Sequence, residues 1–411
     1  MTKPVMSVTA GRLFALSSFA LCSLLFSAAA AAEQFQLQSS CPASFEQVVD
    51  EQGASRCKLV SRYQAYDSLQ NKGVGGTQTA LPTVRDGFSP EQIDLGRFLF
   101  FDPLLSADHS LACASCHQPD KGFTDGKAVS TGFHGQQGKR SAPSLWNVGF
   151  LQRLFWDGRA TSLESQALGP LFAPDEMANT PAQLLGDLAN SSEYVQLFRQ
   201  AFPKDPATTP TLAQVSTALS AFQSTLISLN SRYDQYALGY HEALNDTEIK
   251  GMNVFRSFVA RCAECHTPPL FTNQQLAVIG TPEPEGRAFD LGAGNETDKV
   301  KLQGAFKVPS LRNIVKTAPY MHSGRFTELR EATEFYTKGR GHAVPKDRQL
   351  LIHWHIWEPK LTGEELDQIV AFLGTLTDES LLPQTPTRLP SGLPLPTAAV
   401  AIADPMKRPG E

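Results

Sequence analysis

The sequence lacks several features that would assign it to a common class. It has no excess of positive charge, since 36 Lys and Arg face 41 Asp and Glu, and its formal net charge is −5. Nucleic acid is therefore excluded as a partner, because no basic stripe is available for phosphates. Only seven cysteines occur among 411 residues, and a chain of this length buries sizeable cores without a dense disulfide framework.

Long apolar runs are also absent, apart from one near the start. Residues 13–26 are apolar, but this stretch falls short of the roughly 20 residues that span a bilayer. Lys3 and Arg12 lie before or at its start, and small residues follow it up to Ala32. This pattern predicts a signal peptide over residues 1–32, cleaved near Ala32, and an exported protein with no membrane span after cleavage.

Six cysteines remain after cleavage, since Cys22 lies within the signal peptide. In an oxidising compartment Cys41 and Cys57 are expected to form a local disulfide in an N-terminal extension, residues 33–78, although two free thiols are the alternative. The other four cysteines lie in two copies of one pattern, CASCH at residues 113–117 and CAECH at residues 262–266.

Both copies have the spacing of a c-type heme attachment motif. In each copy the two cysteines, Cys113 and Cys116 or Cys262 and Cys265, lie three apart on one face of a helix, where both can form thioether bonds to a heme. The adjacent histidine, His117 or His266, is then the proximal iron ligand. A redox dithiol and a half zinc site are the alternatives for one copy. Two copies without a thioredoxin-like pattern favour two covalent hemes.

The flanking sequence indicates helices. Ser89-Pro90-Glu91-Gln92 has the form of a capping box, and Thr362 begins a second one. Apolar residues between 212 and 229 recur at three and four, as in an amphipathic helix. No alternating strand pattern of comparable length occurs, so the predicted fold class is all-α.

The domain prediction follows from the positions of the two motifs. Two tandem cytochrome c-like heme domains with long irregular loops are expected, over residues 79–228 and 229–380. Residues 381–411 are rich in proline and lack helical periodicity, which predicts a disordered tail.

Several further motifs resemble those of the bacterial di-heme cytochrome c peroxidase and MauG family, and the resemblance covers roughly residues 85–380. The motifs that carry it, in the order typical of that family, are FWDGRA at 155–160, QALGP at 166–170, EM at 176–177, KVPSLRN at 307–313 and TAPYMHSG at 317–324.

The resemblance implies that the N-terminal heme, on His117, is the peroxidatic one. Glu176 matches the family's distal acid–base residue, and a carboxyl group there could move a proton between the two oxygens of peroxide. Gln166 and Pro170 match residues that shape the same pocket. His134 lies near the loop where related peroxidases place a histidine that caps the resting iron.

Other matches concern the region between the hemes. Trp156 matches the family tryptophan between them, which could carry an electron, although a core aromatic is the alternative. Thr317 and Pro319 match positions whose backbone oxygens hold Ca²⁺, a role suited to hard carbonyl ligands. The family's third calcium ligand is an asparagine, and Ser141 occupies its position here.

The C-terminal heme, on His266, distinguishes the subclasses. Tyr336 stands where peroxidases have a methionine ligand and MauG has a tyrosine, and a phenolate favours oxidised iron. The alternative is that Met321 is the ligand and Tyr336 is only buried. MauG also has a tryptophan two residues before the first cysteine of this motif, and that position here is Ala260.

The resemblance therefore implies a heme peroxidase of the periplasm. It would reduce hydrogen peroxide at the N-terminal heme, with electrons from a small periplasmic c-type cytochrome or cupredoxin delivered through the C-terminal heme. The alternative is a MauG-like enzyme that uses peroxide-derived high-valent hemes to oxidise residues of a partner protein. A two-heme electron carrier is disfavoured by Glu176 and Gln166. Family members are often homodimers.

Overall fold

The computed structural model describes residues 34–63, 81–205, 209–296, 299–339, 344–347 and 349–396, nearly all of them within one compact unit, Phe35–Glu411. The predicted signal peptide and its cleavage site near Ala32 lie outside these residues. The described chain is rich in helices, as predicted. Its α-helices are α1 (Pro90–Phe101), α2 (Cys113–Cys116), α3 (Leu163–Phe172), α4 (Pro181–Asn190), α5 (Ser192–Ala201), α6 (Leu212–Ser224), α7 (Arg232–Ala237), α8 (Asp246–Arg256), α9 (Cys262–Cys265), α10 (Leu329–Phe335) and α11 (Gly363–Gly374).

The helices begin where the predicted caps lie. Ser89 accepts a hydrogen bond from the backbone of Gln92, whose side chain accepts one from the Ser89 backbone, so α1 has a complete capping box. Thr362 and Glu365 form the same arrangement at the start of α11. These contacts satisfy backbone N–H groups that have no partner within the helix.

Two short antiparallel sheets were not predicted. One pairs β1 (Phe45–Val49) with β2 (Ser55–Leu59), and the other pairs β3 (Leu276–Val278) with β4 (Ala305–Lys307). Strands of five and three residues are too short for a clear alternating pattern. The predicted disulfide between Cys41 and Cys57 is present and ties β2 to the chain before β1.

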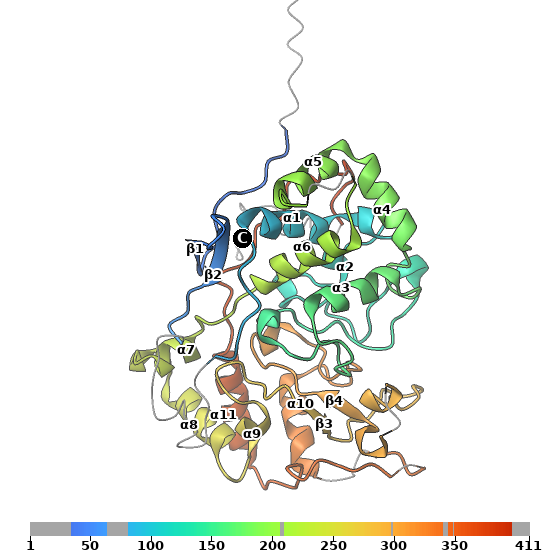
Figure 1. The fold of residues 1–411 in the computed structure, drawn as a ribbon. Coiled ribbons are helices and arrows are strands. Elements are labelled where there is room, and N and C mark those ends of the chain that lie inside the picture. The colour runs from blue at the N-terminus through green and yellow to red at the C-terminus, as the bar shows by residue number, and fades with distance from the viewer. Residues whose placement is uncertain are drawn as a thin grey trace, which may run out of the picture. The chain divides into compact units, whose positions relative to one another are not determined.

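The two halves of the chain repeat one helix crossing (Figure 1). In the first half α1 packs on α6, and in the second half α8 packs on α11. Each crossing depends on a glycine: a Cβ atom on Gly96 would lie 1.8 Å from the Ala218 carbonyl oxygen, and one on Gly251 would lie 1.8 Å from that of Gln368. Only glycine allows the two backbones to approach this closely.

An aromatic pair lies one turn beyond each glycine. The ring centres of Phe100 and Phe222 are 5.1 Å apart, and those of Phe255 and Phe372 are 5.2 Å apart. All four side chains are buried. The two crossings therefore form the centres of two separate apolar cores, one in each half.

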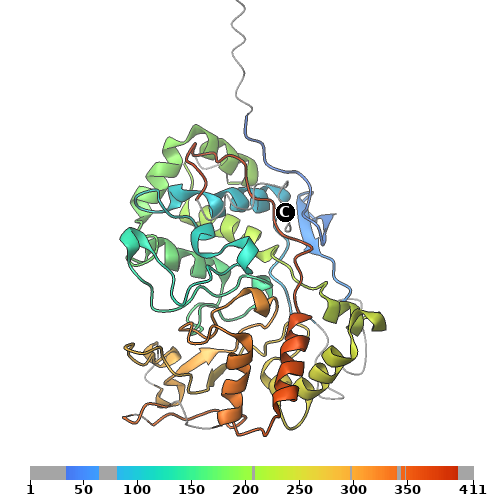
Figure 2. The same cartoon turned by 180° about the vertical axis from the view of Figure 1, so that it is seen from behind.

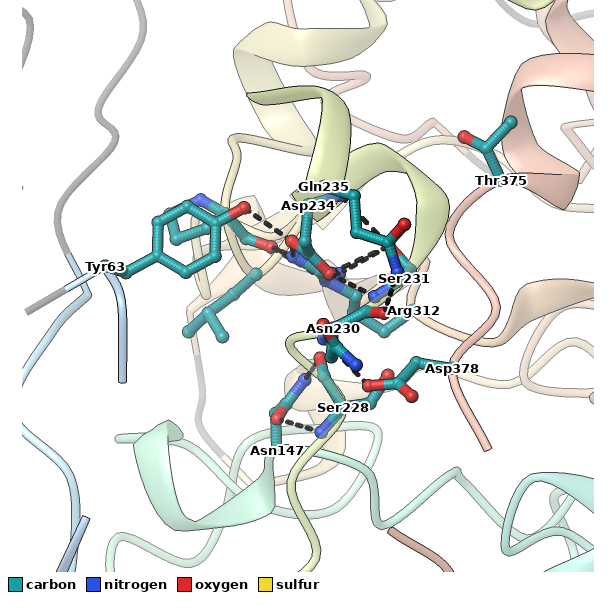
Figure 3. Close-up of polar contacts among 12 residues, drawn as sticks. Tyr63, Asn147, Ser228, Asn230, Ser231, Asp234, Gln235, Arg312, Thr375 and Asp378 are labelled. Atoms are coloured by element: carbon teal, nitrogen blue, oxygen red, sulfur yellow. Dashed lines mark hydrogen bonds and ion pairs between the residues drawn. The ribbon is translucent and has the colours of Figure 1, made fainter. Parts of the chain in front are cut away.

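A second repeated feature is an asparagine in left-handed backbone conformation after a Pro-Ser-Leu sequence. Asn147 (φ 59°) bonds the backbone N–H and carbonyl of Ser228, both at 2.9 Å (Figure 3). Asn313 (φ 58°) makes the same pair of bonds to Asp378, at 2.8 and 3.0 Å. Each asparagine therefore fixes the chain that leaves the last helix of its half.

The loops that contain these asparagines are bonded to each other. The backbone N–H of Ser141 donates to the carbonyl of His322 at 2.8 Å, and that of Lys307 donates to the carbonyl of Trp156 at 2.7 Å. Ser141 and Lys307 each precede their asparagine by six residues, and Trp156 and His322 each follow theirs by nine. Equivalent residues thus exchange equivalent bonds, which is the pattern of a local two-fold axis.

A buried ion pair in the second half also binds a tyrosine of the N-terminal extension (Figure 3). The guanidinium of Arg312 donates to both carboxylate oxygens of Asp234, at 2.5 and 2.7 Å, and neither side chain is exposed. The hydroxyl of Tyr63 donates to the same carboxylate at 2.5 Å. Arg312 also donates to the carbonyl of Pro269 at 2.8 Å, so the charged groups are well satisfied despite their burial.

Residues 381–396 differ from the prediction of a disordered tail. They run back along the first half (Figure 2), where Leu389 is buried in the core and Ser391 donates to Asp102 at 2.8 Å. Arg388 lies over the ring of Phe35. These contacts order an irregular segment that has no helical period of its own. Residues 397–411 lie outside the described chain.

Candidate active site

One cavity of about 820 Å³ brings together nearly all of the predicted site residues. It is lined by side chains from both halves of the chain. The predicted residues among them are Cys113, Cys116, His117, Ser141, Trp156, Gln166, Pro170, Glu176, Cys262, Cys265, His266, Thr317, Pro319, Met321 and Tyr336.

His134 is the predicted residue that does not line the cavity. Its side chain is 69% exposed and lies 3.8 Å from Asp108. The preceding residue, Phe133, donates a backbone hydrogen bond to the Glu176 carbonyl, so this loop covers the outside of the Glu176 segment. His134 is therefore not among the side chains that face the cavity in this arrangement.

The two histidines of the CxxCH motifs are held as metal ligands require. The Nδ1–H of His117 donates to the carbonyl of Phe123 at 2.8 Å, and that of His266 faces the carbonyls of Phe271 and Pro309 at 3.1 and 3.2 Å. This leaves Nε2 of each ring unprotonated for a metal. Burial lowers the pKa of His117, and it lowers the pKa of His266 to about 4, so both rings are neutral near pH 7.

Other groups that line the cavity are also suited to binding two hemes. The four cysteines of α2 and α9 are free thiols facing it. One buried donor that lines it, Trp146 Nε1, has no hydrogen-bond partner within the described chain, and a heme propionate would supply an acceptor. Among the described residues no three His, Cys, Asp or Glu side chains gather to hold a metal ion by themselves.

On the first side of the cavity, helix α3 presents Gln166 and Pro170 one turn apart. Pro170 has no N–H to donate to the Gln166 carbonyl, and the helix ends at Phe172. The turn that follows places Glu176 within electrostatic range of both cysteines of the first motif. This side therefore combines a carboxyl group with an amide and an apolar ring.

Glu176 is poised to exchange a proton. Burial raises the pKa of its carboxyl group above the ordinary 4.5, the negative charge of Asp175 adds to the rise, and Arg159 opposes it. A carboxyl group whose pKa lies closer to neutral pH accepts and returns protons more readily.

On the second side, Tyr336 takes the place that Pro170 has on the first. Each follows the asparagine of its half by 23 residues, and each lies on or just after the helix that faces the cavity. Burial, with the nearby Cys265 and Cys262, raises the pKa of the Tyr336 hydroxyl well above its ordinary value. Met321 corresponds instead to Phe155, and both have left-handed backbone conformation, at φ 71° and 63°.

Between the two sides, Trp156 and His322 meet at a ring distance of 6.5 Å. The indole N–H of Trp156 donates to the Ser141 carbonyl at 2.9 Å. The His322 ring stacks on Phe306 and lies 2.8 Å from a carboxylate oxygen of the buried Glu283. His322 was assigned no definite role from the sequence, and nothing there indicated Glu283 as its partner.

The predicted calcium ligands lie at the same junction. The hydroxyl of Ser141 donates to the Met321 carbonyl at 3.1 Å, and that of Thr317 donates to the Ile314 carbonyl at 3.0 Å. No described group donates a hydrogen bond to the carbonyls of Thr317 or Pro319, which leaves these two oxygens available.

Many residues that were not predicted also line the cavity, and three of them have chemistry of interest. Lys307 is buried, and burial lowers its pKa to about 8. It lies within the KVPSLRN motif, so the sequence held a signal for it. His355 and Trp357 reach the second side from a distant segment, and His355 lies 2.7 Å from Glu264 of α9. No local pattern indicated that contact.

No described helix has both the length and the apolar character needed to cross a bilayer.

Residues 90–242 match the sequence profile of the di-haem cytochrome c peroxidase family. The chain is 35% identical to cytochrome c551 peroxidase of Nitrosomonas europaea, over 71% of this chain and 82% of that protein. It is 36% identical to the methylamine utilization protein MauG of Methylorubrum extorquens, over 72% and 82%. It is also similar to the crystal structure of a MauG-like protein associated with microbial copper homeostasis, with a TM-score of 0.66, 32% identity and coverage of 74% and 95%.

Proposed function

Because the chain belongs to the di-haem cytochrome c peroxidase family and is an oxidoreductase acting on peroxide, we propose that it reduces hydrogen peroxide in the periplasm with electrons from a small redox protein. Two electrons and two protons convert H₂O₂ into two molecules of water. The N-terminal side of the cavity receives the peroxide, and the electrons arrive through the C-terminal side.

Two covalently bound c hemes are part of this proposal. Cys113 and Cys116 would attach the first, with His117 as its iron ligand. Cys262 and Cys265 would attach the second, with His266 and Tyr336 as its ligands. The hemes supply redox chemistry that no side chain of the protein provides. The equivalence of Tyr336 with Pro170 supports a ligated second heme and a first heme whose far face is free for substrate.

The chain's own contribution at the first side is proton transfer. Glu176 as a carboxylate would take a proton from one oxygen of the peroxide and return it to the other oxygen, which would depart as water. Gln166 and Pro170 bound the pocket and keep other groups from the far face. The observation that carries this role is the raised pKa of a carboxyl group beside the first CxxCH motif.

Steady-state peroxide reduction with a reduced c-type cytochrome tests the proposal. The holoenzyme should turn over, and Glu176→Gln should lower turnover by about 10²–10⁴-fold while leaving heme content unchanged. Glu193→Gln is the matched control, because Glu193 lies in the first turn of α5 and does not line the cavity. Equal loss in both variants, or none in Glu176→Gln, would contradict the role of Glu176.

A second function has a specific observation in its favour. Tyr336 lines the second side where a phenolate ligand would stabilise oxidised iron, and that arrangement suits oxidation of a partner protein's residues as in MauG. Little steady-state turnover, together with a long-lived oxidised protein after peroxide, would favour this function over peroxide removal.

Three further features belong to the proposal. The two cores correspond to tandem cytochrome c-like domains, residues 79–228 and 229–380, and the supporting observation is the repeated glycine crossing. Ca²⁺ binds through the carbonyls of Thr317 and Pro319 with Ser141 nearby, and a chelator should then lower the melting temperature reversibly.

The mature protein begins after Ala32, which mass analysis of its N-terminus would test. It forms homodimers, which light scattering would test.

A further inference from the structure

Exposed apolar side chains occur in two segments that contact each other at the second heme attachment motif, where the Arg261 guanidinium lies over the rings of Phe258 and Trp357. They come from two segments, one just before Cys262 and one that returns from residues 351–357. The exposed side chains are Phe258 (76%), Val259 (50%), Leu351 (62%), Trp354 (66%) and Trp357 (40%). Exposed rings on both sides of one arginine beside a candidate heme site need an explanation, because exposed apolar residues are usually isolated.

Trp357 differs from the other exposed side chains of these segments because it also lines the cavity. Its side chain is 40% exposed, so one indole contacts both the interior and the surface. Trp354 is more exposed, at 66%, and is not among the residues that line the cavity. The two tryptophans thus lie three residues apart in one segment but have different access to the interior.

Specific contacts hold Trp357 against the second motif. The guanidinium of Arg261, the residue before Cys262, lies 4.6 Å from the Trp357 ring centre and 4.0 Å from that of Phe258. Arg261 has left-handed backbone conformation (φ 56°), and its Nε donates to the Phe258 carbonyl at 3.0 Å. The contact between His355 and Glu264, at 2.7 Å, fixes the same segment to α9.

We propose that Trp357 is the residue through which an electron passes from a bound protein donor into the second side of the cavity. This inference rests on the proposed function, since it assumes that a heme is attached to Cys262 and Cys265. The conjugated indole bridges surface and interior. It gives one electron to the oxidised second side and then takes one electron from the donor, so Trp357 itself is unchanged after each transfer. Two such transfers, with two protons, supply the reduction of one H₂O₂.

The chemistry of the surface defines the donor. It is a small redox protein with an apolar rim around an exposed cofactor edge, which would pack on Phe258 and Trp354. A basic protein is favoured, because the formal net charge of this chain is −5 and opposite charges speed encounter.

Stopped-flow reduction of the peroxide-oxidised holoenzyme by a reduced basic c-type cytochrome tests the electron path. Trp357→Phe should lower the limiting rate at saturating donor by about tenfold, which corresponds to about 1.4 kcal/mol of activation free energy. Trp354→Phe is the matched control and should change only the donor concentration needed for half saturation. Reduction by dithionite should be the same in all three proteins, which shows that the hemes are intact.

A second measurement needs no donor protein. Peroxide is added to the holoenzyme alone, and tryptophan oxidation is located by mass spectrometry. Oxidants in solution would modify Trp354 first because it is more exposed, whereas withdrawal of electrons through the cavity would modify Trp357 first. Preferential modification of Trp354, or an unchanged limiting rate in Trp357→Phe, would overturn the proposal. Failure of the proposed function would differ: electrons would enter normally, but peroxide would not be reduced.

Discussion

Replacing Arg312 by methionine should destabilise the protein far more than the same change at a surface arginine. Arg312 and Asp234 are both fully buried and share two hydrogen bonds of 2.5 and 2.7 Å. Arg312→Met leaves the Asp234 carboxylate in the interior without its cation, and breaking a buried pair in this way costs about 3–5 kcal/mol. The donors that remain on Asp234 are the hydroxyl of Tyr63 and the backbone N–H and hydroxyl of Ser231, and these neutral groups do not replace the lost positive charge.

Arg330→Met provides the comparison. Arg330 also contacts two carboxylates, Glu334 at 2.7 Å and Asp367 at 3.0 Å, but its side chain is 41% exposed. Water solvates the carboxylates that remain, and exposed ion pairs contribute only about 0–1 kcal/mol. Urea unfolding of both holoproteins, followed by circular dichroism, measures the two free energies side by side.

A double variant separates the lost ion pair from lost packing. Asp234→Asn together with Arg312→Met removes both charges, so it should be more stable than Arg312→Met alone. The reasoning is refuted if Arg312→Met costs no more than Arg330→Met, or if the double variant is as unstable as the single one. If Arg312→Met costs no more than Arg330→Met, other groups in the interior must stabilise the Asp234 charge. If the double variant is as unstable as Arg312→Met, the lost stability comes from lost packing and not from the broken ion pair.

Four other outcomes are expected. Glu176→Gln should lower kcat for peroxide by about 10²–10⁴-fold at unchanged heme content, the usual range for a positioned proton-transfer group. The raised pKa of Glu176 means that the active carboxylate is lost as pH falls through a value above 4.5, so the wild-type rate should have an acidic limb there that Glu176→Gln lacks. Gly251→Ala should destabilise the protein by about 1–3 kcal/mol, because the added Cβ atom would overlap the facing helix. Gly186→Ala in α4 should stabilise it by about 0.5–1 kcal/mol, because a Cβ atom there would have no other atom within 4 Å. Thermal melts of the two variants compare the effects. Replacing Cys41 and Cys57 by serine should cost about 3 kcal/mol, as for a loop of similar length, and equal stability with and without reductant in the wild type would contradict this.

The site could be predicted where the chemistry is local in sequence. The cysteines and histidine of each CxxCH motif are adjacent, and the caps at Ser89 and Thr362 act within one helical turn, so short patterns were enough. Glu176 and Gln166 needed the family resemblance, because a lone carboxylate or amide in a loop carries no signal of its own.

The repeat between the two halves could not be predicted from a fixed spacing. Cys113 and Cys262 are 149 residues apart, but Asn147 and Asn313 are 166 residues apart. Different loop lengths between the shared contacts destroy any constant period. Each equivalence becomes visible only in the contacts themselves, such as a glycine at a helix crossing or an asparagine that holds the end of a half.

Contacts over long sequence distances were missed for a similar reason. His355 lies 91 residues after Glu264, and no periodicity links the two. The segment 381–396 was expected to be disordered because it lacks a helical pattern, yet Leu389 and Ser391 pack against the first half. Irregular chain can be ordered by tertiary contacts alone, and composition does not report this.

The reciprocal bonds between the loops of the two halves have a thermodynamic consequence. A ligand on the first side that displaces the Trp156 loop must strain or break the bond from Lys307, and one on the second side that displaces the His322 loop must act on the bond from Ser141. If a ligand displaces either loop, occupancy of its side would change the affinity of the other, and linkage requires the two changes to be equal in free energy. Two separate binding events would thus become one allosteric system, joined through two backbone amides.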